Sequence, residues 1–376
     1  MCVNTSLEES EEMKQEKFIF FLEEIPRYLR LPYFAFYLSI TVIMEILRIA
    51  VNYLTIVTTM RLSINYLVTF WLSNWLYFMW PICMILMYYT MKYLRNYTLH
   101  TLTQIRHRLI ASPTWSLRLV FRSRFQHLIP VCFLAICTWV FVTGWLDNSN
   151  IMFYSTAGPV LTVPTRQIPL QFVQWALLVT YNWIIGGYFS WICLGTVIVA
   201  LEASRHIDTN RIEIFHHDRC GGLSAAGHLS MATAMLYILS VSFMLPAWIV
   251  SMSHAPDPTG LVLQIGALSC LAMMELAIFL LPMFFFHPKM KKAKDQQLAI
   301  LDGRITRFSK SIMRNNASEV ENGQFQNIIS VQELVRSMYE YPFNYDMLAK
   351  VGTSTLIPYL AAAIASAIQR GLRIGT

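Results

Sequence analysis

The stretch of residues 205–228 holds the side chains in this sequence whose types could do chemistry. It reads RHIDTNRIEIFHHDRCGGLSAAGH and lies between two long apolar segments. Imidazole and carboxylate groups are ligands that zinc, iron and manganese accept. The candidate metal ligands are His206, His216, His217, Asp218 and His228. A membrane-embedded, metal-dependent enzyme that acts on a lipid at the cytoplasmic face is therefore one hypothesis for this protein.

A turn at the membrane surface is the alternative interpretation of the same stretch. Gly221 and Gly222 allow a tight backbone turn, and the Asp218 carboxylate can order the backbone that follows it. The chain lacks an HExxH motif and the paired HxxxH and HxxHH boxes, and its seven cysteines form no CxxC pair. We therefore assign no catalytic residue and predict no cofactor other than the divalent metal of the first hypothesis.

Three ionisable residues lie within apolar segments, and they are Glu45, Arg48 and Glu275. Such residues are costly to bury in lipid and often mark ion or proton paths. Glu45 and Arg48 are three residues apart on one helix face and can form an ion pair, with Glu275 as an interhelical partner. They predict either a gate or ion path, or a polar clamp that fixes helix packing.

The composition indicates the environment of these residues. Hydrophobic residues make up 55% of the 376 residues, charged residues make up 14%, and the mean hydropathy is +0.45. In a typical soluble domain, charged residues make up about a quarter of the sequence. A soluble fold could not bury as much apolar surface as this chain contains. The net charge of +7 gathers in alternate loops, as the positive-inside rule predicts, and no nucleic-acid partner is expected. The predicted fold class is all-α, a polytopic transmembrane helical bundle with cytoplasmic helical extensions.

Apolar segments of about 20 residues predict the membrane spans. Six segments are long enough, and a seventh would be short because Pro358 interrupts it. The six cover approximately 33–57, 65–89, 128–145, 170–200, 229–252 and 261–287, and the seventh covers 351–368. The last segment could instead be a re-entrant or interfacial helix, because Arg370 and Arg373 behind it disfavour crossing.

The loops between these spans predict the orientation of the chain. The loop 92–127 is basic and contains no acidic residue, which favours a cytoplasmic position for it and for the N-terminus. The expected location is the plasma membrane. The predicted parts are a cytoplasmic N-terminal segment, 1–32; a transmembrane bundle, 33–287, with the basic loop 92–127 and the His-rich loop 201–228; a cytoplasmic helical region, 288–345; and a C-terminal short transmembrane, re-entrant or interfacial helix, 346–376.

The cytoplasmic region 288–345 is predicted to contain two helices. In the first, five apolar residues recur at spacings of three and four, which is an a/d seam of about two heptads. They are Leu298, Leu301, Ile305, Phe308 and Ile312. A seam this short should pack against other cytoplasmic helices or a second subunit. After a polar linker, 314–327, the sequence SVQE at 330–333 predicts a capping box that opens the second helix.

Two short elements resemble sequences of uncharacterised bacterial multi-pass inner-membrane proteins. Residues 216–223, HHDRCGGL, are similar to an HxDxxGGL-type loop of those proteins. Residues 341–344, YPFN, are similar to a Trp-Pro-Phe-Asp element and differ from it at the first and last positions. The resemblance implies a bacterial inner membrane and no established activity.

The order of the segments is also similar to that of insect chemoreceptor-like ion channels. Both have an N-terminus inside, several spans, basic cytoplasmic helical extensions, and a long cytoplasmic stretch before a short final span. The TYhhhhhQF-type motif of their last span is absent from this sequence. This likeness of architecture implies a channel, but architecture alone does not establish function.

Three functions remain open at this point. A channel or transporter of unknown substrate comes first, a membrane anchor or assembly protein that recruits a partner through its cytoplasmic helices comes second, and the metal-dependent enzyme comes third. The expected partners are membrane lipids, a second copy of the chain, and a cytoplasmic protein.

Overall fold

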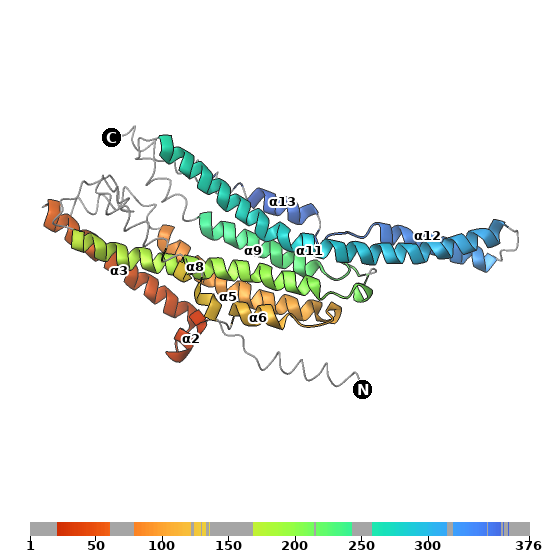
Figure 1. Ribbon diagram of the computed structural model, residues 1–376, viewed down its shortest axis with the longest axis horizontal. Helices are drawn as coiled ribbons and strands as arrows, with labels where there is room; N and C mark the ends of the chain where they lie inside the picture. The colour runs from red at the N-terminus through yellow and green to blue at the C-terminus, as the bar shows by residue number, and fades with distance from the viewer. Residues whose placement is uncertain are drawn as a thin grey trace. The chain divides into compact units, whose positions relative to one another are not determined.

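The structure is a computed structural model, and it describes most of the chain (Figure 1). The described residues are 21–60, 79–121, 124–128, 130–132, 135, 168–213, 216–242, 258–313, 319–343, 345–354, 356 and 360.

Every regular element in these residues is helical. The long helices are α3 (Tyr33–Met60), α5 (Met79–Ile105), α8 (Ile168–Arg205), α9 (Ser224–Ser242), α11 (Pro258–Met313) and α12 (Glu319–Arg336). The shorter elements are α2 (Phe21–Tyr28), α6 (Thr114–Phe121), α13 (Tyr345–Ser354) and the 3-10 helices η2 (Arg106–Arg108), η3 (Arg124–His127) and η5 (Thr209–Arg211). The one β-type pairing among the described residues is an isolated antiparallel bridge between Leu109 and Ile207. The all-α prediction is therefore confirmed for this part of the chain.

Two described helical stretches are long and apolar enough to cross a membrane. They are Ile184–Arg205 in α8 and Ala272–Lys310 in α11. A third is reached if α2 and α3, which are bent by 98° at their junction, count as one broken span. The prediction of six spans is thus not met by the described helices, of which two or three qualify. The predicted spans 65–89, 128–145 and 229–252, and the short seventh at 351–368, each lie partly outside the described residues.

One compact unit, called unit 1 here, contains Met1–Lys92, Thr114–Gly195 and Phe243–Gly260. In its described part, Tyr37 of α3 holds the α2 helix by donating a hydrogen bond to the Leu22 carbonyl at 2.5 Å. Trp191 of α8 donates its indole N–H to the Val120 carbonyl of α6 at 3.0 Å. Side-chain donors therefore satisfy backbone carbonyls where these helices meet.

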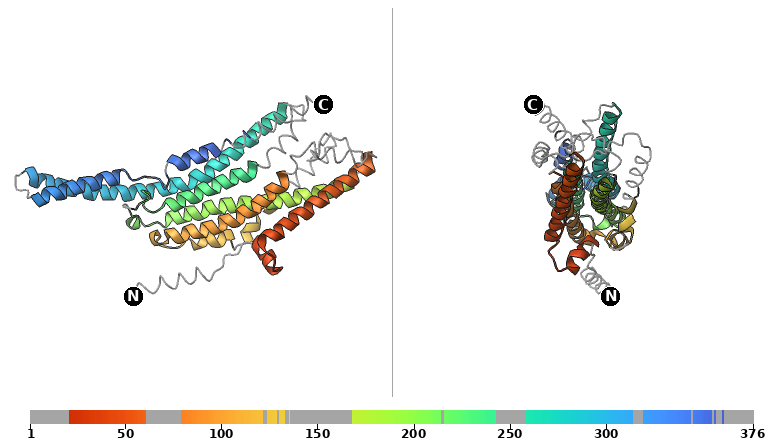
Figure 2. Two further views of the ribbon diagram at one scale, coloured as in Figure 1. Left: turned by 180° about the vertical axis from the view of Figure 1, so that it is seen from behind. Right: turned by 90° about the vertical axis from the view of Figure 1, so that its left-hand side faces the viewer.

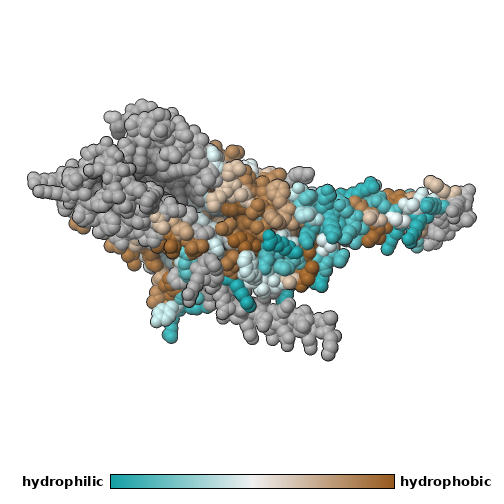
Figure 3. Space-filling view, viewed as in Figure 1, coloured by the Kyte–Doolittle hydropathy of each residue, from teal (hydrophilic) through white to brown (hydrophobic). Residues whose placement is uncertain are grey.

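The other compact unit, called unit 2, contains Tyr93–Pro113, Thr196–Ser242 and Leu261–Thr376. Within it, α13 lies along α9, and the distal part of α11 runs beside α12 in the views of both Figure 1 and Figure 2. Gln332 of α12 is 9% exposed and donates to Asp302 of α11 at 2.5 Å. Hydrophilic residues cover much of this helix pair (Figure 3). The pair therefore has the polar surface expected of an extension that stands outside lipid.

The start of α12 differs from the prediction. The helix begins at Glu319, so Ser330 lies in its interior, and both the predicted capping box and the described part of the predicted linker are wrong. The Ser330 hydroxyl donates to the Gln326 carbonyl at 3.1 Å, one turn earlier in the helix. On α11, Leu301 of the seam is 8% exposed and its four other members are half-buried. The neighbouring α12 thus covers part of the seam within one chain.

Candidate functional site

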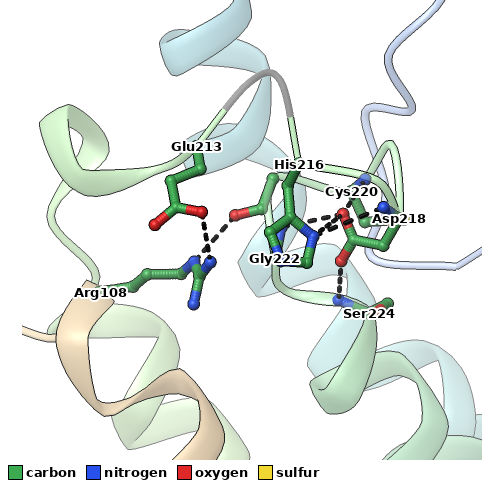
Figure 4. Close-up of polar contacts among 8 residues, drawn as sticks. Arg108, Glu213, His216, Asp218, Cys220, Gly222 and Ser224 are labelled. Atoms are coloured by element: carbon green, nitrogen blue, oxygen red, sulfur yellow. Dashed lines mark hydrogen bonds and ion pairs between the residues drawn. The ribbon is translucent and has the colours of Figure 1, made fainter.

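The His-rich loop connects α8 to α9 in unit 2, and Asp218 fixes its centre (Figure 4). Asp218 Oδ1 accepts hydrogen bonds from the backbone N–H groups of Cys220 at 2.8 Å and Gly222 at 3.0 Å. Its Oδ2 accepts from the N–H of Ser224 at 3.3 Å. Ser224 begins α9, so the carboxylate also meets the positive end of that helix. One side chain therefore both closes the turn and caps the helix.

The turn requires both of its glycines. Gly221 and Gly222 have φ angles of 65° and 75°, which L side chains rarely adopt. A Cβ atom on Gly221 would lie 2.3 Å from Cγ2 of Ile212, and one on Gly222 would lie 2.0 Å from Nη2 of Arg108. Backbone conformation and space both exclude a larger side chain at these two positions.

Arg108, one of the cations of the basic loop, braces this turn. The side chain is buried, and its Nε donates to the Gly221 carbonyl at 3.0 Å. Its Nη2 lies 3.2 Å from Oε2 of Glu213, whose side chain is 63% exposed. The sequence did not predict this role of Arg108. The positive charge of the loop indicates only its side of the membrane, and the carbonyl that Arg108 contacts belongs to Gly221, 113 residues away.

The backbones of the two loops also pair directly. The N–H of Ile110 donates to the His206 carbonyl at 2.8 Å, and the N–H of Asp208 donates to the Arg108 carbonyl at 2.9 Å. These bonds flank the isolated bridge between Leu109 and Ile207. The basic loop and the His-rich loop therefore form one structure within unit 2.

The electrostatics of the turn favour an ionised carboxylate. Burial raises the pKa of Asp218, but hydrogen bonds from Gly222, Cys220, Ser224 and His216 outweigh burial and lower this pKa to about 2. Burial, followed by the charge of Asp218, raises the pKa of the Cys220 thiol to about 12. The thiol is thus protonated at neutral pH and is no nucleophile.

The five predicted metal ligands are spread over the loop and its flanks. His216 Nδ1 lies 2.9 Å from Asp218 Oδ1, and the rings of His216 and His217 are 4.2 Å apart. His206 follows the end of α8, and His228 is exposed on α9. Among the described residues, no group of three or more His, Cys, Asp or Glu side chains could hold a metal ion. The geometry around Asp218 is that of the turn interpretation, and metal binding stays a prediction.

Comparison with known proteins does not identify a function for this chain. No protein-family model, no curated protein and no solved structure matches the chain. The resemblances to bacterial inner-membrane proteins and to insect chemoreceptor-like channels stay predictions.

The Tyr341-Pro342-Phe343 element forms a junction next to the turn. Just before it, the N–H of Tyr339 donates to the Arg219 carbonyl at 3.0 Å. The ring of His287 on α11 stacks on the tyrosine of the element, with centroids 4.3 Å apart. A Cβ atom on Gly227 of α9 would lie 1.8 Å from the carbonyl oxygen of its proline. This element therefore joins the turn, α9 and α11, a role that its sequence did not predict.

Glu275 is a fully buried carboxylate in the part of α11 that is apolar enough to cross a membrane. Ser354 at the end of α13 is 3% exposed and donates its hydroxyl to Glu275 Oε1 at 2.6 Å. The Val351 carbonyl lies 2.8 Å from the same hydroxyl, but a carboxylate is the stronger acceptor. The C-terminal region, predicted as a short transmembrane, re-entrant or interfacial helix, thus supplies a partner for this buried acid.

Glu45 and Arg48 both lie on α3 in unit 1. Glu45 is half-buried and interacts electrostatically with Tyr181 of α8. The side chain of Arg48 lies outside the described part of the chain, so the predicted Glu45–Arg48 pair stays a prediction. The predicted contact with Glu275 also stays a prediction, because Glu275 belongs to unit 2.

A group of hydroxyls near Glu45 was missed by sequence reasoning. The Tyr181 hydroxyl lies 3.2 Å from the hydroxyl of Tyr88 and 3.2 Å from that of Thr41. These residues come from α3, α5 and α8, up to 140 positions apart, and each alone is an ordinary residue of an apolar helix. No local pattern connects them.

Replacing Gly222 with alanine should destabilise the protein. The substitution forces a positive φ on an L residue, at a cost of about 1–3 kcal/mol, and drives its Cβ into the Arg108 guanidinium. Thermal unfolding of the detergent-solubilised protein measures the loss. Gly323→Ala on α12 is the matched control, because its Cβ meets nothing within 4 Å, and it should leave the melting temperature equal or slightly higher. Equal melting temperatures for Gly222→Ala and the wild type would contradict this account.

The Asp218 turn should also lose stability in acid. Folding lowers the pKa of Asp218 from its ordinary 3.8 to about 2, so the stabilisation is complete above about pH 4 and is lost as the pH falls toward 2. At 1.36 kcal/mol per pH unit the effect is on the order of 2 kcal/mol. Melting temperatures between pH 6 and pH 3 should fall less steeply for Asp218→Asn than for the wild type. Asp295→Asn, an exposed change on α11, should keep the wild-type slope; equal slopes for all three proteins would refute the assignment.

Proposed function

We propose that this protein is a channel or transporter of the plasma membrane. The observation that carries the proposal is Glu275, whose side chain has no exposed surface in a helix apolar enough to cross a membrane. An ionisable group in such a helix costs free energy and is a candidate for an ion or proton path by default. The hydrogen bond from the Ser354 hydroxyl orients its carboxyl group.

The position of Glu275 between α11 and α13 supports a role in coupling the binding of an ion or solute to a movement of these helices. Ser354 ends α13, which lies along α9, and α13 follows directly after the Tyr341-Pro342-Phe343 element. A change of charge or of ligand at Glu275 therefore acts on α11 and α13 together. Such a contact between two helices is suited to couple occupancy of a site to a rearrangement.

The loop pairing supports an even number of crossings between the two loops. A backbone hydrogen bond of 2.8 Å between Ile110 and His206 requires both to be on one side of a bilayer that is about 30 Å thick. If α8 crosses once between them, an odd number of further crossings is needed, and the predicted span 128–145 would supply one. The backbone hydrogen bond between Tyr339 and Arg219 supports the same conclusion for the chain between these two residues. If α11 crosses once there, a span that begins in α9 would supply the second crossing. We infer that this shared side is the cytoplasm, since the positive-inside rule predicts a cytoplasmic position for the basic loop.

The other two functions have less support from the geometry. The enzyme hypothesis needs Asp218 as a ligand or acid–base group, but its oxygens already accept three backbone N–H bonds and contact His216. The anchor hypothesis needs a free seam on α11, and α12 lies beside that seam and covers part of it. The channel or transporter is therefore the function we favour.

Replacing Glu275 with glutamine should change flux through the protein without changing its abundance. Glutamine keeps an acceptor for Ser354 and removes the negative charge, so a charge-dependent path should lose at least about tenfold in rate, a change of about 1.4 kcal/mol in a barrier. Ion and solute flux into liposomes containing the purified protein measures the effect.

Ser354→Ala is the matched control for this measurement. It removes the hydrogen bond but keeps the charge, so it should reduce flux much less than Glu275→Gln does. If Ser354→Ala and Glu275→Gln instead lower the folded yield equally, Glu275 is a packing clamp. An absence of flux in wild-type liposomes across a broad panel of ions and solutes would argue against the proposed function.

Cysteine labelling should find the basic loop, the His-rich loop and the segment after α12 on one side of the membrane. The side chains of His107, His217 and Ser337 are exposed and suit substitution by cysteine. In sealed right-side-out vesicles, a membrane-impermeant maleimide should label all three variants only after permeabilisation, above the background of the unsubstituted protein. Labelling of any one of them from the opposite side would contradict the loop pairing.

A further inference from the structure

Backbone hydrogen bonds fix a bend between α2 and α3 in unit 1. At the end of α2, the N–H of Leu31 donates to the Pro26 carbonyl at 2.8 Å, and the N–H of Arg30 donates to the Arg27 carbonyl at 3.1 Å. These two bonds form a Schellman cap, with Arg30 in the left-handed conformation at a φ of 56°. Pro32 follows the cap and cannot continue the helix. The two helices therefore meet at 98° (Figure 1).

A side-chain contact holds the other end of α2 against α3. The Tyr37 hydroxyl of α3 donates to the Leu22 carbonyl near the start of α2 at 2.5 Å. The side chains of Leu22, Glu23 and Pro26 are buried, so this side of α2 packs against the protein. The short helix is thus held at its start by Tyr37 and at its end by the cap.

The surface of the bend combines cations with large apolar side chains. Residues 27–34 read RYLRLPYF. The exposed members of this segment include Arg27, Tyr28, Leu29, Arg30, Leu31 and Phe34, and Tyr28 is 89% exposed. Such a mixture suits the boundary between headgroups and acyl chains, where apolar side chains enter the lipid and cationic groups stay at the polar surface.

Lys92 of α5 adds a third cation to the bend. Its side chain is exposed, and its Nζ lies 4.9 Å from the centre of the Tyr33 ring. Tyr33 is the first residue of α3, and its hydroxyl donates to the Tyr88 carbonyl of α5 at 3.1 Å. Lys92 also begins the basic loop, for which the positive-inside rule predicts a cytoplasmic position. The bend therefore lies at the end of α3 that this rule predicts to be cytoplasmic.

The charges of the bend favour an anionic partner. Two acids of α2 lie near the three cations: Glu23 is buried and Glu24 is exposed. Among the described residues, no carboxylate forms an ion pair with Arg27 or Arg30. Both guanidinium groups are thus available to an anion from outside the chain.

The angle of the bend would place α2 along a membrane surface. After the bend, α3 exposes apolar side chains at intervals of four residues, at Leu38, Val42 and Ile46. This outward face suits a helix that crosses lipid. The eight residues of α2 extend for about 12 Å, which is too short to cross a hydrocarbon core of about 30 Å. If α3 crosses the membrane, a bend of 98° lays α2 in the plane of the surface.

We propose that the α2–α3 bend binds an anionic phospholipid of the cytoplasmic leaflet. Arg27, Arg30 and Lys92 bind the headgroup, since guanidinium and ammonium groups form charge-assisted hydrogen bonds to phosphate and carboxylate oxygens. Tyr28 and Leu31 contact the upper part of the acyl chains. The cytoplasmic leaflet is negatively charged, which matches the three cations. This site goes beyond the proposed function, because it requires a membrane but no flux.

The test is native mass spectrometry of the purified full-length protein in detergent, titrated with phosphatidylserine or with phosphatidylcholine. The wild type should bind phosphatidylserine more tightly. Each cation near a membrane surface contributes about fivefold, so Arg27→Gln/Arg30→Gln/Lys92→Gln should weaken phosphatidylserine binding at least about tenfold. Binding of phosphatidylcholine should change much less, because its headgroup carries no net charge.

A matched triple variant controls for the loss of charge. Arg304→Gln/Arg307→Gln/Lys310→Gln removes three exposed cations from the polar part of α11 and should keep the wild-type affinity for phosphatidylserine. Equal losses in the two triple variants would mean that only the net charge attracts the lipid, and this would overturn the site. Equal affinity of the wild type for the two lipids would also overturn it.

Two further measurements keep the test decisive. Arg27→Gln/Lys92→Gln leaves Arg30 at its positive φ, so it preserves the cap if the triple variant fails to fold, and it should show an intermediate loss. Wild-type affinity in this double variant would contradict the proposal. Soluble glycerophosphoserine carries the same headgroup without acyl chains and should compete poorly. Competition as strong as that of phosphatidylserine would show a site for small anions and overturn the assignment to a lipid.

Discussion

The structure of unit 2 depends on one carboxylate that accepts backbone hydrogen bonds. Asp218 gathers three N–H groups, and this folds the glycine turn onto the first residue of α9. Because the turn is folded, the Gly221 carbonyl faces Arg108 and the Arg219 carbonyl faces Tyr339. Two loops and the end of the α12 region therefore converge on positions that a single side chain holds in place. Buried backbone groups must be paired, and here one acid satisfies several of them at once.

The two units solve the same problem of buried polarity by different means. In unit 2, ionised side chains pair with backbone groups, and the charge of Asp218 is spread over several donors. In unit 1, neutral hydroxyls on three helices satisfy one another around Tyr181. Neutral groups cost less to remove from water than ions do, which suits a region predicted to lie in lipid. Glu45 in unit 1 and Glu275 in unit 2 are the acidic residues of the predicted spans, the first half-buried and the second fully buried.

Sequence patterns predicted local features well and distant contacts poorly. The helical class, the long apolar stretches of α8 and α11, and the turn at Asp218 all depend on residues close in sequence, so composition and spacing identify them. The start of α12 was wrong because a capping-box sequence can also occur inside a helix whose Ser330 bonds back to Gln326. The roles of Arg108 and of Ser354 could not be predicted, since each partner lies far along the chain. Periodicity indicates which face of a helix is buried and does not name the residue that covers it.

The turn around Asp218 is built almost wholly from main-chain atoms, and this has an evolutionary consequence. The side chains of His217 and Arg219 are exposed, whereas Asp218 holds the turn by its hydrogen bonds, and Gly221 and Gly222 have no space for a larger side chain. Natural selection on the fold should therefore leave the outer surface of this loop free to diverge between descendants of a common ancestor. Different lineages could present different residues there on an unchanged scaffold, and the loop could acquire new binding preferences without any cost to the architecture beneath it.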